Sequence, residues 1–258
     1  MQNSPAYYVK ATLNRATWRV RRRWRWGRRG YVERPAGVLH GLAPEDAQEI
    51  ARLCAAYEVC FETTFDADHA MSNYGLLQLL DVATTQCRWQ VPSQPRVIDV
   101  GSLNFSYAAV LHAWLHPQKL VGIELDGYRL YDNLHTRHSY AQHYIRDLPA
   151  TEYCVMNFLA YNAPADLITM LYPFVVPEPL VHWDLPLAEF QPAQIFAHAH
   201  QLLTPGGFVV MANFGAEEFQ AAAPLMRRAG FALHGSCVYE GGLSEHQIPS
   251  YVSVWSRL

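Results

Sequence analysis

Residues able to bind a nucleoside gather around two apolar runs in the middle of the chain. The stretch VIDVGSLNFSYA holds Asp99 and Gly101 at the end of the first run, and Glu124 closes the second run, 23 residues after Gly101. A carboxylate at the end of a second parallel strand can accept hydrogen bonds from both ribose hydroxyls of an adenosine-containing cofactor. The alternative is that Glu124 only caps the next helix together with Asp126. The spacing and the residue type favour the cofactor.

A loop expected over residues 172–184 (YPFVVPEPLVHWD) carries residues suited to proton transfer. Histidine is the side chain suited to general-base chemistry at neutral pH, which makes His182 a candidate general base, and the hydroxyl of Tyr172 can donate or accept a hydrogen bond and so orient a substrate. The competing interpretation is an ordinary surface histidine and a core tyrosine with a solvated hydroxyl. Trp183 and Asp184 are the other candidates in this loop.

Several other kinds of site lack their sequence signatures. The chain has no GxGxxG turn for a dinucleotide, no GxxxxGK[ST] loop for a nucleoside triphosphate and no GxSxG elbow for a hydrolase. His135, His138 and His143 share one segment, but no HExxH motif accompanies them, so we expect no metal site. The five cysteines form no CxxC pair, which argues against a zinc knuckle and a disulfide framework.

Short apolar runs alternate with helix-length segments after Pro95, which is the pattern of βαβ units. Five runs predict parallel strands at 96–100, 119–124, 153–158, 166–171 and 207–212. A closing hairpin is predicted over 231–239 and 250–256. Helices are predicted at 106–115, 127–143, 192–203 and 216–229. Loops at the carboxyl ends of such strands meet at one crevice, where Gly101 and Glu124 should lie together.

The first 34 residues differ from the rest of the chain in charge. They hold nine Arg and one Lys against one Glu, a net charge of +9, whereas the remainder carries −12. Ser4 and Pro5 predict the start of a helix over residues 5–26. Its apolar residues form one narrow stripe between arginines: Ala6, Val9, Leu13, Ala16, Val20 and Trp24. An anionic membrane surface is the favoured partner of this helix, and nucleic acid or the acidic body of the protein itself are the alternatives.

The chain divides by composition and periodicity into an Arg- and Trp-rich arm over 1–34, a helical cap over 35–90 and an α/β domain over 91–258. With 50% hydrophobic and 17% charged residues it can bury a large core, which excludes global disorder. Helices predicted at 44–60 and 73–88 form the cap, and Tyr74 is a weaker lid candidate. No apolar run suggests a signal peptide or a membrane span, so we expect a cytoplasmic protein that is soluble or peripheral at the inner face of the membrane.

Five segments resemble the successive motifs of class I S-adenosylmethionine-dependent methyltransferases: VIDVGSLNFSYA, LVGIELDGYR, YCVMNFLAY, ADLITMLYPF and LLTPGGFVVMANFG. The resemblance covers roughly residues 90–258. It implies a Rossmann-like α/β fold, with a seven-stranded, mostly parallel sheet flanked by helices, the last strand antiparallel and the N-terminal helices as an extension. It also implies S-adenosylmethionine as the cofactor, bound by Asp99, Gly101, Ser102, Asn104, Phe105, Glu124, Asn157 and Phe158.

Individual roles follow from the same resemblance. Gly101 begins the loop that receives the methionine part of the cofactor, and Glu124 is the ribose-binding acid. Asn157 and Phe158 lie beside the adenine. The methyl acceptor lies under the 172–184 loop, with His182 and Tyr172 as candidate catalytic residues.

The first loop of this chain departs from the family pattern. That loop usually has two or three glycines, whereas this chain has Leu103 and Phe105 at the later positions, where a Cβ hinders close approach and positive φ. Asn104 tolerates a left-handed conformation and could bind an amino-acid moiety, with Phe105 packed beneath it.

The function expected from these features is methyl transfer from S-adenosylmethionine to a small-molecule or lipid-linked acceptor. The glycine-poor loop motivates one alternative, a binding or scaffold protein with the same architecture and no turnover. The basic arm motivates a second, an RNA-associated methyltransferase, although nucleic acid is the less favoured partner. No feature of the sequence indicates an oligomeric state.

Overall fold

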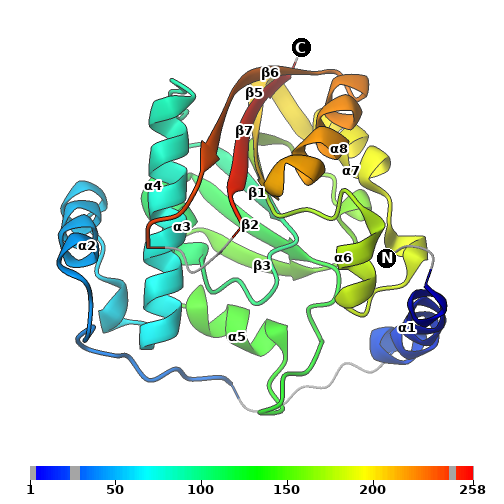
Figure 1. Ribbon diagram of the computed structural model, residues 1–258, viewed down its shortest axis with the longest axis horizontal. Helices are drawn as coiled ribbons and strands as arrows, with labels where there is room; N and C mark the ends of the chain where they lie inside the picture. The colour runs from blue at the N-terminus through cyan, green and yellow to red at the C-terminus, as the bar shows by residue number, and fades with distance from the viewer. Residues whose placement is uncertain (1–3, 24–29, 244–247, 258) are drawn as a thin grey trace.

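A seven-stranded sheet forms the centre of the computed structural model, which describes residues 4–23, 30–243 and 248–257 (Figure 1). The strand order is β3-β2-β1-β4-β5-β7-β6. Neighbours from β3 to β5 are parallel, whereas β7 lies antiparallel between β5 and β6. The strands are β1 (Arg96–Val100), β2 (Lys119–Glu124), β3 (Thr151–Val155), β4 (Ala165–Leu171), β5 (Leu203–Phe214), β6 (Phe231–Tyr239) and β7 (Ser250–Arg257). The predicted fold class and the closing hairpin are confirmed.

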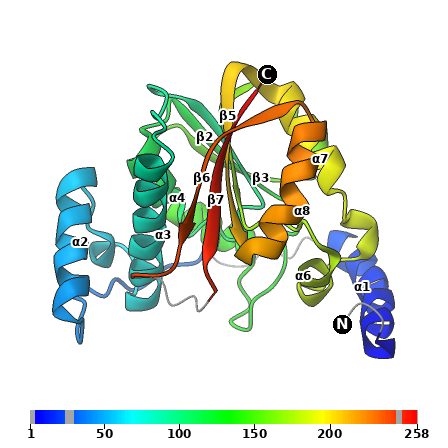
Figure 2. The same cartoon turned by 45° about the horizontal axis from the view of Figure 1, so that its top comes forward.

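Helices cover both faces of the sheet (Figures 1 and 2). The first face carries α3 (Ala67–Gln86), α4 (Ala108–Leu115) and α5 (Arg137–Tyr144), with α2 (Pro44–Tyr57) packed outside α3. The second face carries α6 (Pro177–His182), α7 (Pro192–Leu202) and α8 (Gly215–Arg228). Single 3-10 turns are η1 (Phe61–Thr63), η2 (Phe158–Ala160) and η3 (Leu187–Glu189). The remaining helix, α1 (Pro5–Arg23), lies beside α6, on the opposite side of the molecule from α2.

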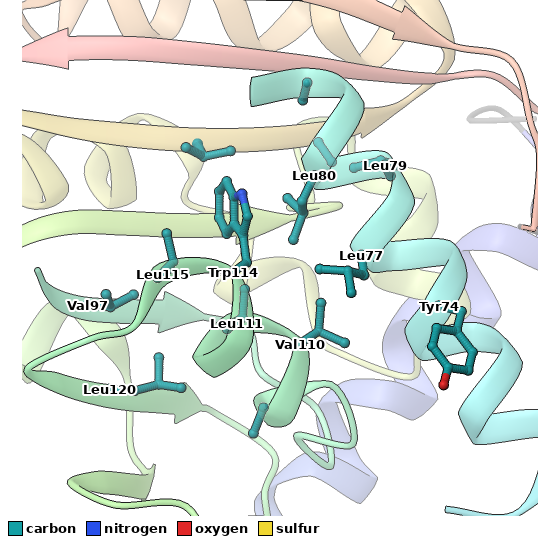
Figure 3. Packing of buried hydrophobic residues seen from close by; sticks show 14 of the residues in the cluster. Tyr74, Leu77, Leu79, Leu80, Val97, Val110, Leu111, Trp114, Leu115 and Leu120 are labelled. Carbon is teal, nitrogen blue, oxygen red and sulfur yellow. The ribbon is translucent and has the colours of Figure 1, made fainter. Parts of the chain in front are cut away.

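Alternate residues of the strands build two separate cores. Val97 and Leu167 pack on the first face, whereas their neighbours Ile98 and Ile168 pack on the second, because successive side chains of a strand point to opposite faces. Figure 3 shows side chains of α3 and α4, including Trp114, meeting over the strands of the first face. Burial on both faces explains why these strands read as nearly continuous apolar runs in the sequence.

The helix predicted over 127–143 is wrong in its first half. Residues 127–136 form turns, with a bridge between Leu130 and Thr136, and helix α5 begins only at Arg137. The side chain of Asn133 accepts a hydrogen bond from the His135 N–H, a local contact that competes with helix formation. Thr136 then caps α5 by accepting from the Ser139 N–H. His135 therefore lies outside the helix that carries His138 and His143.

Strand β3 ends three residues earlier than predicted. The side-chain oxygen of Asn157 accepts a hydrogen bond from the Leu159 N–H at 2.9 Å, and this cap starts the turn η2. Asn157 and Phe158 consequently lie in the loop after β3, where the ends of the parallel strands meet. Strand β5 is longer than predicted, because it begins at Leu203 and includes the TPGG segment.

A buried ion pair ties the extended segment before α2 to helix α3. Glu33 Oε1 lies 2.8 Å from His69 Nδ1 and accepts a hydrogen bond from the Asp66 N–H at 3.0 Å. Asp66 is the N-cap of α3 and accepts from the His69 N–H. The possible metal-ligand atoms of these three residues lie within 4.8 Å of one another, but the ion pair and the cap already use them.

We expect His69→Ala to lower the free energy of unfolding by about 3 kcal/mol at pH 6, because it removes the main partner of a buried carboxylate. Burial alone would raise the pKa of Glu33, but hydrogen bonds from His69 and the Asp66 N–H lower it to about 2. The hydrogen bond to Glu33 raises the pKa of His69. Urea unfolding across the pH range measures the loss in the variant.

The pH dependence of that loss has a defined sign. Glu33 contributes stability above its unfolded pKa of about 4.5 and loses it as the pH falls toward its folded value. His69 contributes below its unfolded pKa of about 6.5 and loses its contribution as the pH rises through its raised folded value. The difference between native protein and variant should therefore peak at about pH 4.5–6.5. The exposed residue His40 supplies the control His40→Ala, and a pH-independent difference would contradict the ion pair.

Helix α1 begins as predicted, since the Tyr7 N–H donates to Ser4 Oγ at 3.3 Å. The helix is described as far as Arg23, so the predicted continuation to residue 26, with Trp24 and Trp26, lies outside the described residues. Within the described ranges, no helix combines the length and the apolarity needed to cross a membrane.

Candidate functional site

A cavity of about 340 Å³ lies at the carboxyl ends of the parallel strands. Gly101 after β1, Glu124 at the end of β2, Asn157 and Phe158 after β3, and Tyr172 after β4 all line it. Four of the eight residues predicted around a cofactor thus share one hollow, at the position where parallel sheets of this kind bind ligands. The fold brings these residues together although they lie far apart in the chain.

The loop after β1 adopts the backbone that the resemblance predicts for a glycine-rich turn, although only the first of its left-handed positions is a glycine. Gly101, Leu103 and Phe105 have φ angles of 83°, 50° and 56°, all in the left-handed region. This conformation costs a non-glycine residue of order 1–2 kcal/mol, so the surrounding contacts must hold it. The Leu103 N–H donates to Glu124 Oε2 at 3.0 Å, and the Leu103 carbonyl accepts from the Tyr153 hydroxyl.

Phe105 and Asn104 do not have the roles predicted for them. Phe105 is fully buried and lies outside the cavity lining, with its ring packed against Gly122 of β2. Asn104 has no positive φ and does not line the cavity either; its side chain accepts a hydrogen bond from the Ser106 N–H. The left-handed positions are the two flanking Asn104, because the loop alternates its backbone to reach both Glu124 and the core.

Asp99 and Ser102 support the loop from behind rather than lining the cavity. Asp99 is completely buried and accepts hydrogen bonds from Thr169 Oγ1 at 2.6 Å and from the Tyr107 hydroxyl at 2.8 Å. Burial raises the pKa of Asp99, although these hydrogen bonds oppose the shift. Ser102 donates to the Asp99 carbonyl at 3.0 Å. Both residues therefore hold the backbone around Gly101 in place.

Glu124 is buried at the wall of the cavity, and most of its hydrogen-bonding capacity is already used. Oε1 accepts from the Asp126 N–H at 2.8 Å and from Arg137 Nη1 at 3.0 Å, and Oε2 accepts from the Leu103 N–H. A carboxylate offers about four acceptor positions, so this arrangement leaves one, on Oε2. Glu124 therefore has capacity for one further hydrogen bond, whereas the sequence-based prediction requires two.

Arg137 is a site residue that the sequence did not indicate. It is buried, lines the cavity, and lies with its guanidinium carbon 5.7 Å from the ring centroid of Trp183. Burial alone would lower the pKa of Arg137, but Glu124, Tyr131 and Asp126 together raise it. The Arg137–Glu124 pair fixes the orientation of the carboxylate. A lone arginine after a turn carries no motif, so only the fold reveals this pairing.

Tyr172 lies on the far side of the cavity, at the end of β4. Its ring stacks on Phe214 with a centroid distance of 3.9 Å, and its hydroxyl lies 2.9 Å from Ser250 Oγ. Burial raises the pKa of Tyr172. The hydroxyl is therefore a neutral hydrogen-bonding group held by Ser250 of β7. The orienting role of Tyr172 stays a prediction.

His182 is not brought into the cavity. It ends helix α6, its side chain is exposed, and its carbonyl accepts from Lys10 of α1. The cavity is instead lined from this segment by Leu180 and Trp183, because α6 turns its other side inward. The predicted general base therefore lies on the outer side of the wall.

Glu218 supplies a titratable group inside the cavity where His182 does not. It lies in the first turns of α8, and its Oε2 accepts from the Phe214 N–H at 2.9 Å. Burial raises the pKa of this carboxyl. From the sequence, its position at a helix start is explained by dipole complementarity, with a role near the acceptor as the less favoured interpretation. Glu218 and Tyr172 are far apart in the sequence, so only the fold shows that they line the same cavity.

The prediction of Tyr74 as a lid residue is wrong. Tyr74 is fully buried in α3, its hydroxyl donates to Glu62 and accepts from the Phe61 N–H, and it does not line the cavity. Helix α3 packs on the first face of the sheet against α4, away from the cavity mouth.

Helix α1 packs a polar face against the outer side of the cavity wall. The side chain of Asn14, buried, donates to the carbonyls of Val181 and Leu185 at 2.9 and 3.1 Å. Trp18, also buried, donates to Glu189 Oε1 at 3.2 Å. Leu185 and Glu189 line the cavity from their other side. A single stretch of chain thus separates α1 from the candidate site.

Charged contacts extend this docking toward Glu124. Arg21 lies 3.1 Å from Asp126, two residues beyond Glu124, and also donates to the Asp184 carbonyl at 2.8 Å. The Asp184 carboxylate pairs with Lys10 at 3.3 Å and with Arg129 at 2.8 Å. Three cations therefore meet two acids along one seam, and two of the cations, Lys10 and Arg21, belong to α1.

Comparison with known proteins shows likeness in structure alone. No protein-family model matches the chain, and no curated protein sequence matches it. The N-methyltransferase NodS from Bradyrhizobium japonicum WM9, solved with S-adenosyl-L-homocysteine, aligns with a TM-score of 0.51 at 10% identity, over 70% of this chain and 85% of NodS. A methyltransferase from Pyrococcus furiosus aligns with a TM-score of 0.50 at 13% identity, over 82% of this chain and 97% of its own. TrmN from Thermus thermophilus aligns with a TM-score of 0.49 at 21% identity, over 71% of this chain but only 48% of TrmN.

The strand order, the antiparallel β7 and the alignments with NodS and the Pyrococcus furiosus protein together define the fold. The chain has the fold of the class I S-adenosylmethionine-dependent methyltransferases, as the sequence motifs predicted.

Proposed function

We propose that the protein is an enzyme that transfers a methyl group from S-adenosylmethionine to an acceptor bound beside Tyr172. The observation that carries the proposal is the cavity itself, which runs from Gly101 past Glu124 to Asn157 and Phe158. These residues lie at the ends of successive parallel strands, in the order that the methionine, ribose and adenine parts of the cofactor require. The hollow holds space for a nucleoside instead of being filled by the protein's own side chains.

The residues present fit such a cofactor. Gly101 has φ 83°, and a Cβ built on it would meet no heavy atom within 4 Å, so its backbone borders open space. The free acceptor position on Glu124 Oε2 can receive a ribose hydroxyl, and Phe158 offers an apolar surface to the adenine ring. When bound, the cofactor supplies an activated methyl group on a sulfonium.

The acceptor side of the cavity provides positioning and a proton acceptor. Methyl transfer to oxygen or nitrogen requires alignment of the two reacting atoms and a group that takes the acceptor's proton. Glu218, with its raised pKa, is one of the carboxylates that line this side, the other being Glu189, and Tyr172 lines the cavity at the end of β4. Mass spectrometry of extracts from cells with the native protein, with Glu218→Gln and without the protein would identify the methylated species.

Titration calorimetry with S-adenosylmethionine and S-adenosyl-L-homocysteine tests the proposed function. We expect both to bind the full chain with a dissociation constant in the micromolar range, about −8 kcal/mol, because the cavity is largely pre-formed. Failure of the folded protein to bind either ligand would overturn the enzyme and the cofactor together. It would leave the scaffold protein, the alternative motivated by the glycine-poor loop.

For location we propose a cytoplasmic protein, peripheral at the inner face of the membrane, acting on a lipid-linked or membrane-proximal acceptor. The support is the position of α1, which packs directly behind the segment that walls the acceptor side of the cavity. An RNA-associated enzyme is the other candidate, for which the same arginines would serve as phosphate contacts. The two partners differ in their use of apolar side chains: a membrane surface binds them, whereas RNA phosphates do not. The basic helix exposes such apolar side chains beside its arginines.

A further inference from the structure

The face of α1 that points away from the protein is both apolar and basic. Val9, Leu13 and Val20 are 60, 59 and 56% exposed, although an amphipathic helix ordinarily turns such a stripe toward the core. Arg15 and Arg19 are also exposed and lie along one side of this apolar stripe. We call this surface the outer face; its members are Ala6, Val9, Leu13, Arg15, Ala16, Arg19 and Val20.

The stripe remains outside because the opposite face of the helix is held firmly. Asn14 and Trp18 are buried against the segment after α6, and Lys10 and Arg21 form ion pairs with Asp184 and Asp126. Rotating the helix to bury Leu13 would break all of these contacts. The orientation of the stripe is therefore a property of the folded protein and not of a loose arm.

Chemistry selects the partner of the outer face. Helix α1 contains no acidic residue, so its outward surface carries only positive charge beside apolar side chains. A duplex or single strand of nucleic acid would use Arg15 and Arg19 but would leave the aliphatic stripe in water. An anionic bilayer can bind both the arginines and the aliphatic stripe, because valine and leucine enter the acyl boundary while arginine contacts the headgroups.

We propose that the outer face of α1 binds the surface of an anionic phospholipid bilayer and thereby holds the α6 wall of the cavity beside the headgroups. Figures 1 and 2 show α1 at the edge of the molecule next to α6, with α2 and α3 on the opposite side. The acceptor would then be an amphiphile presented at that surface. This last step rests on the proposed methyltransferase function, whereas the binding to lipid does not.

Vesicle flotation of the full chain tests the proposal. The native protein should float with vesicles of phosphatidylglycerol and phosphatidylcholine and remain behind with vesicles of phosphatidylcholine alone. Val9→Gln, Leu13→Gln and Val20→Gln together should abolish flotation, because the apolar insertion is lost while every arginine remains. Arg15→Gln with Arg19→Gln should lower the partition coefficient about 30-fold.

Matched variants separate the outer face from general surface properties. Val32→Gln with Val38→Gln removes exposed aliphatic side chains elsewhere, and Arg146→Gln with Arg228→Gln removes two exposed arginines elsewhere. Both control pairs should float like the native protein. Circular dichroism and binding of S-adenosyl-L-homocysteine should be unchanged in all variants, so that loss of flotation is not loss of folding or of the cofactor site.

Three outcomes would overturn the proposal. The first is no flotation of the folded native protein with anionic vesicles. The second is flotation that the glutamine substitutions on the apolar stripe leave unchanged. The third is retardation of a single-stranded or duplex RNA that depends on Arg15 and Arg19 but not on the stripe, in the absence of vesicle binding. None of these outcomes bears on whether S-adenosyl-L-homocysteine binds the cavity, so the two proposals fail independently.

Discussion

Replacing Glu124 by alanine should lower the free energy of unfolding by about 3–5 kcal/mol and weaken binding of S-adenosyl-L-homocysteine by at least about 100-fold. The stability falls because the guanidinium of Arg137, buried beside it, loses its counter-charge. The affinity falls for two reasons, since the carboxylate that we propose as the ribose acceptor is removed and the Leu103 N–H loses the partner that holds the loop. Urea unfolding measures the first effect, and calorimetry on the folded fraction measures the second.

Two further variants separate the two effects of Glu124. Glu152 lies on the neighbouring strand β3 and pairs with Lys119 at the surface, so Glu152→Ala should change stability by less than about 1 kcal/mol and leave binding intact. Glu124→Gln retains an acceptor oxygen and the packing volume but not the charge, and should bind more weakly than the native protein and more tightly than the alanine variant. Unchanged affinity of Glu124→Ala would place the ribose elsewhere in the cavity.

A methyl group added at Gly122 should destabilise the protein by about 2–3 kcal/mol and reduce cofactor binding. A Cβ at this position would lie 2.6 Å from Cε1, 2.8 Å from Cδ1 and 2.9 Å from Cζ of Phe105. Phe105 cannot retreat, because it is completely buried at the end of the left-handed loop. Gly122→Ala therefore forces either the strand or the loop that begins at Gly101 to move. Urea unfolding and calorimetry with S-adenosyl-L-homocysteine would record both consequences.

Two further substitutions test the Gly122→Ala prediction: one that removes the clash and one control at another glycine. Phe105→Leu removes the ring atoms that collide, so the double variant with Gly122→Ala should be more stable than the sum of the two single effects by about 1–2 kcal/mol. Gly30 has no heavy atom within 4 Å of a built Cβ and no positive φ, and Gly30→Ala should be neutral. A Gly122→Ala protein as stable as the native one would show that the close contact between β2 and the loop does not contribute to the free energy of unfolding.

The fold was predictable because its signals are local and repeated. Strands β1 and β2 and the hairpin strand β6 match their predicted bounds, since strands buried on both faces are apolar throughout and end at polar turns. The clustering of Gly101 and Glu124 in one cavity was predictable for a related reason: they lie at strand ends, and topology places those ends at one edge.

Errors arose where side chains compete with the backbone. Asn133 and Asn157 each accept a hydrogen bond from a nearby N–H. Asn133 lies in the turns that replace the first half of a predicted helix, and Asn157 caps the turn that follows a shortened strand. Both residues are compatible with either outcome, so periodicity could not decide. For the same reason, the sequence favoured Asn104 as the left-handed residue of the first loop. In the structure, contacts with Glu124 and the core impose that conformation on Leu103 and Phe105 instead.

Taken alone, the sequence determined the sheet, the strand ends that face the cavity and the amphipathic character of the first helix, because these depend on the order of apolar and polar residues. Only the tertiary structure decided that Arg137 holds Glu124, that Glu218 rather than His182 enters the cavity, and that α1 turns its apolar stripe outward. Each of these depends on contacts between residues far apart in the chain. Residue spacing carries no record of such contacts, since they arise from how rigid elements pack.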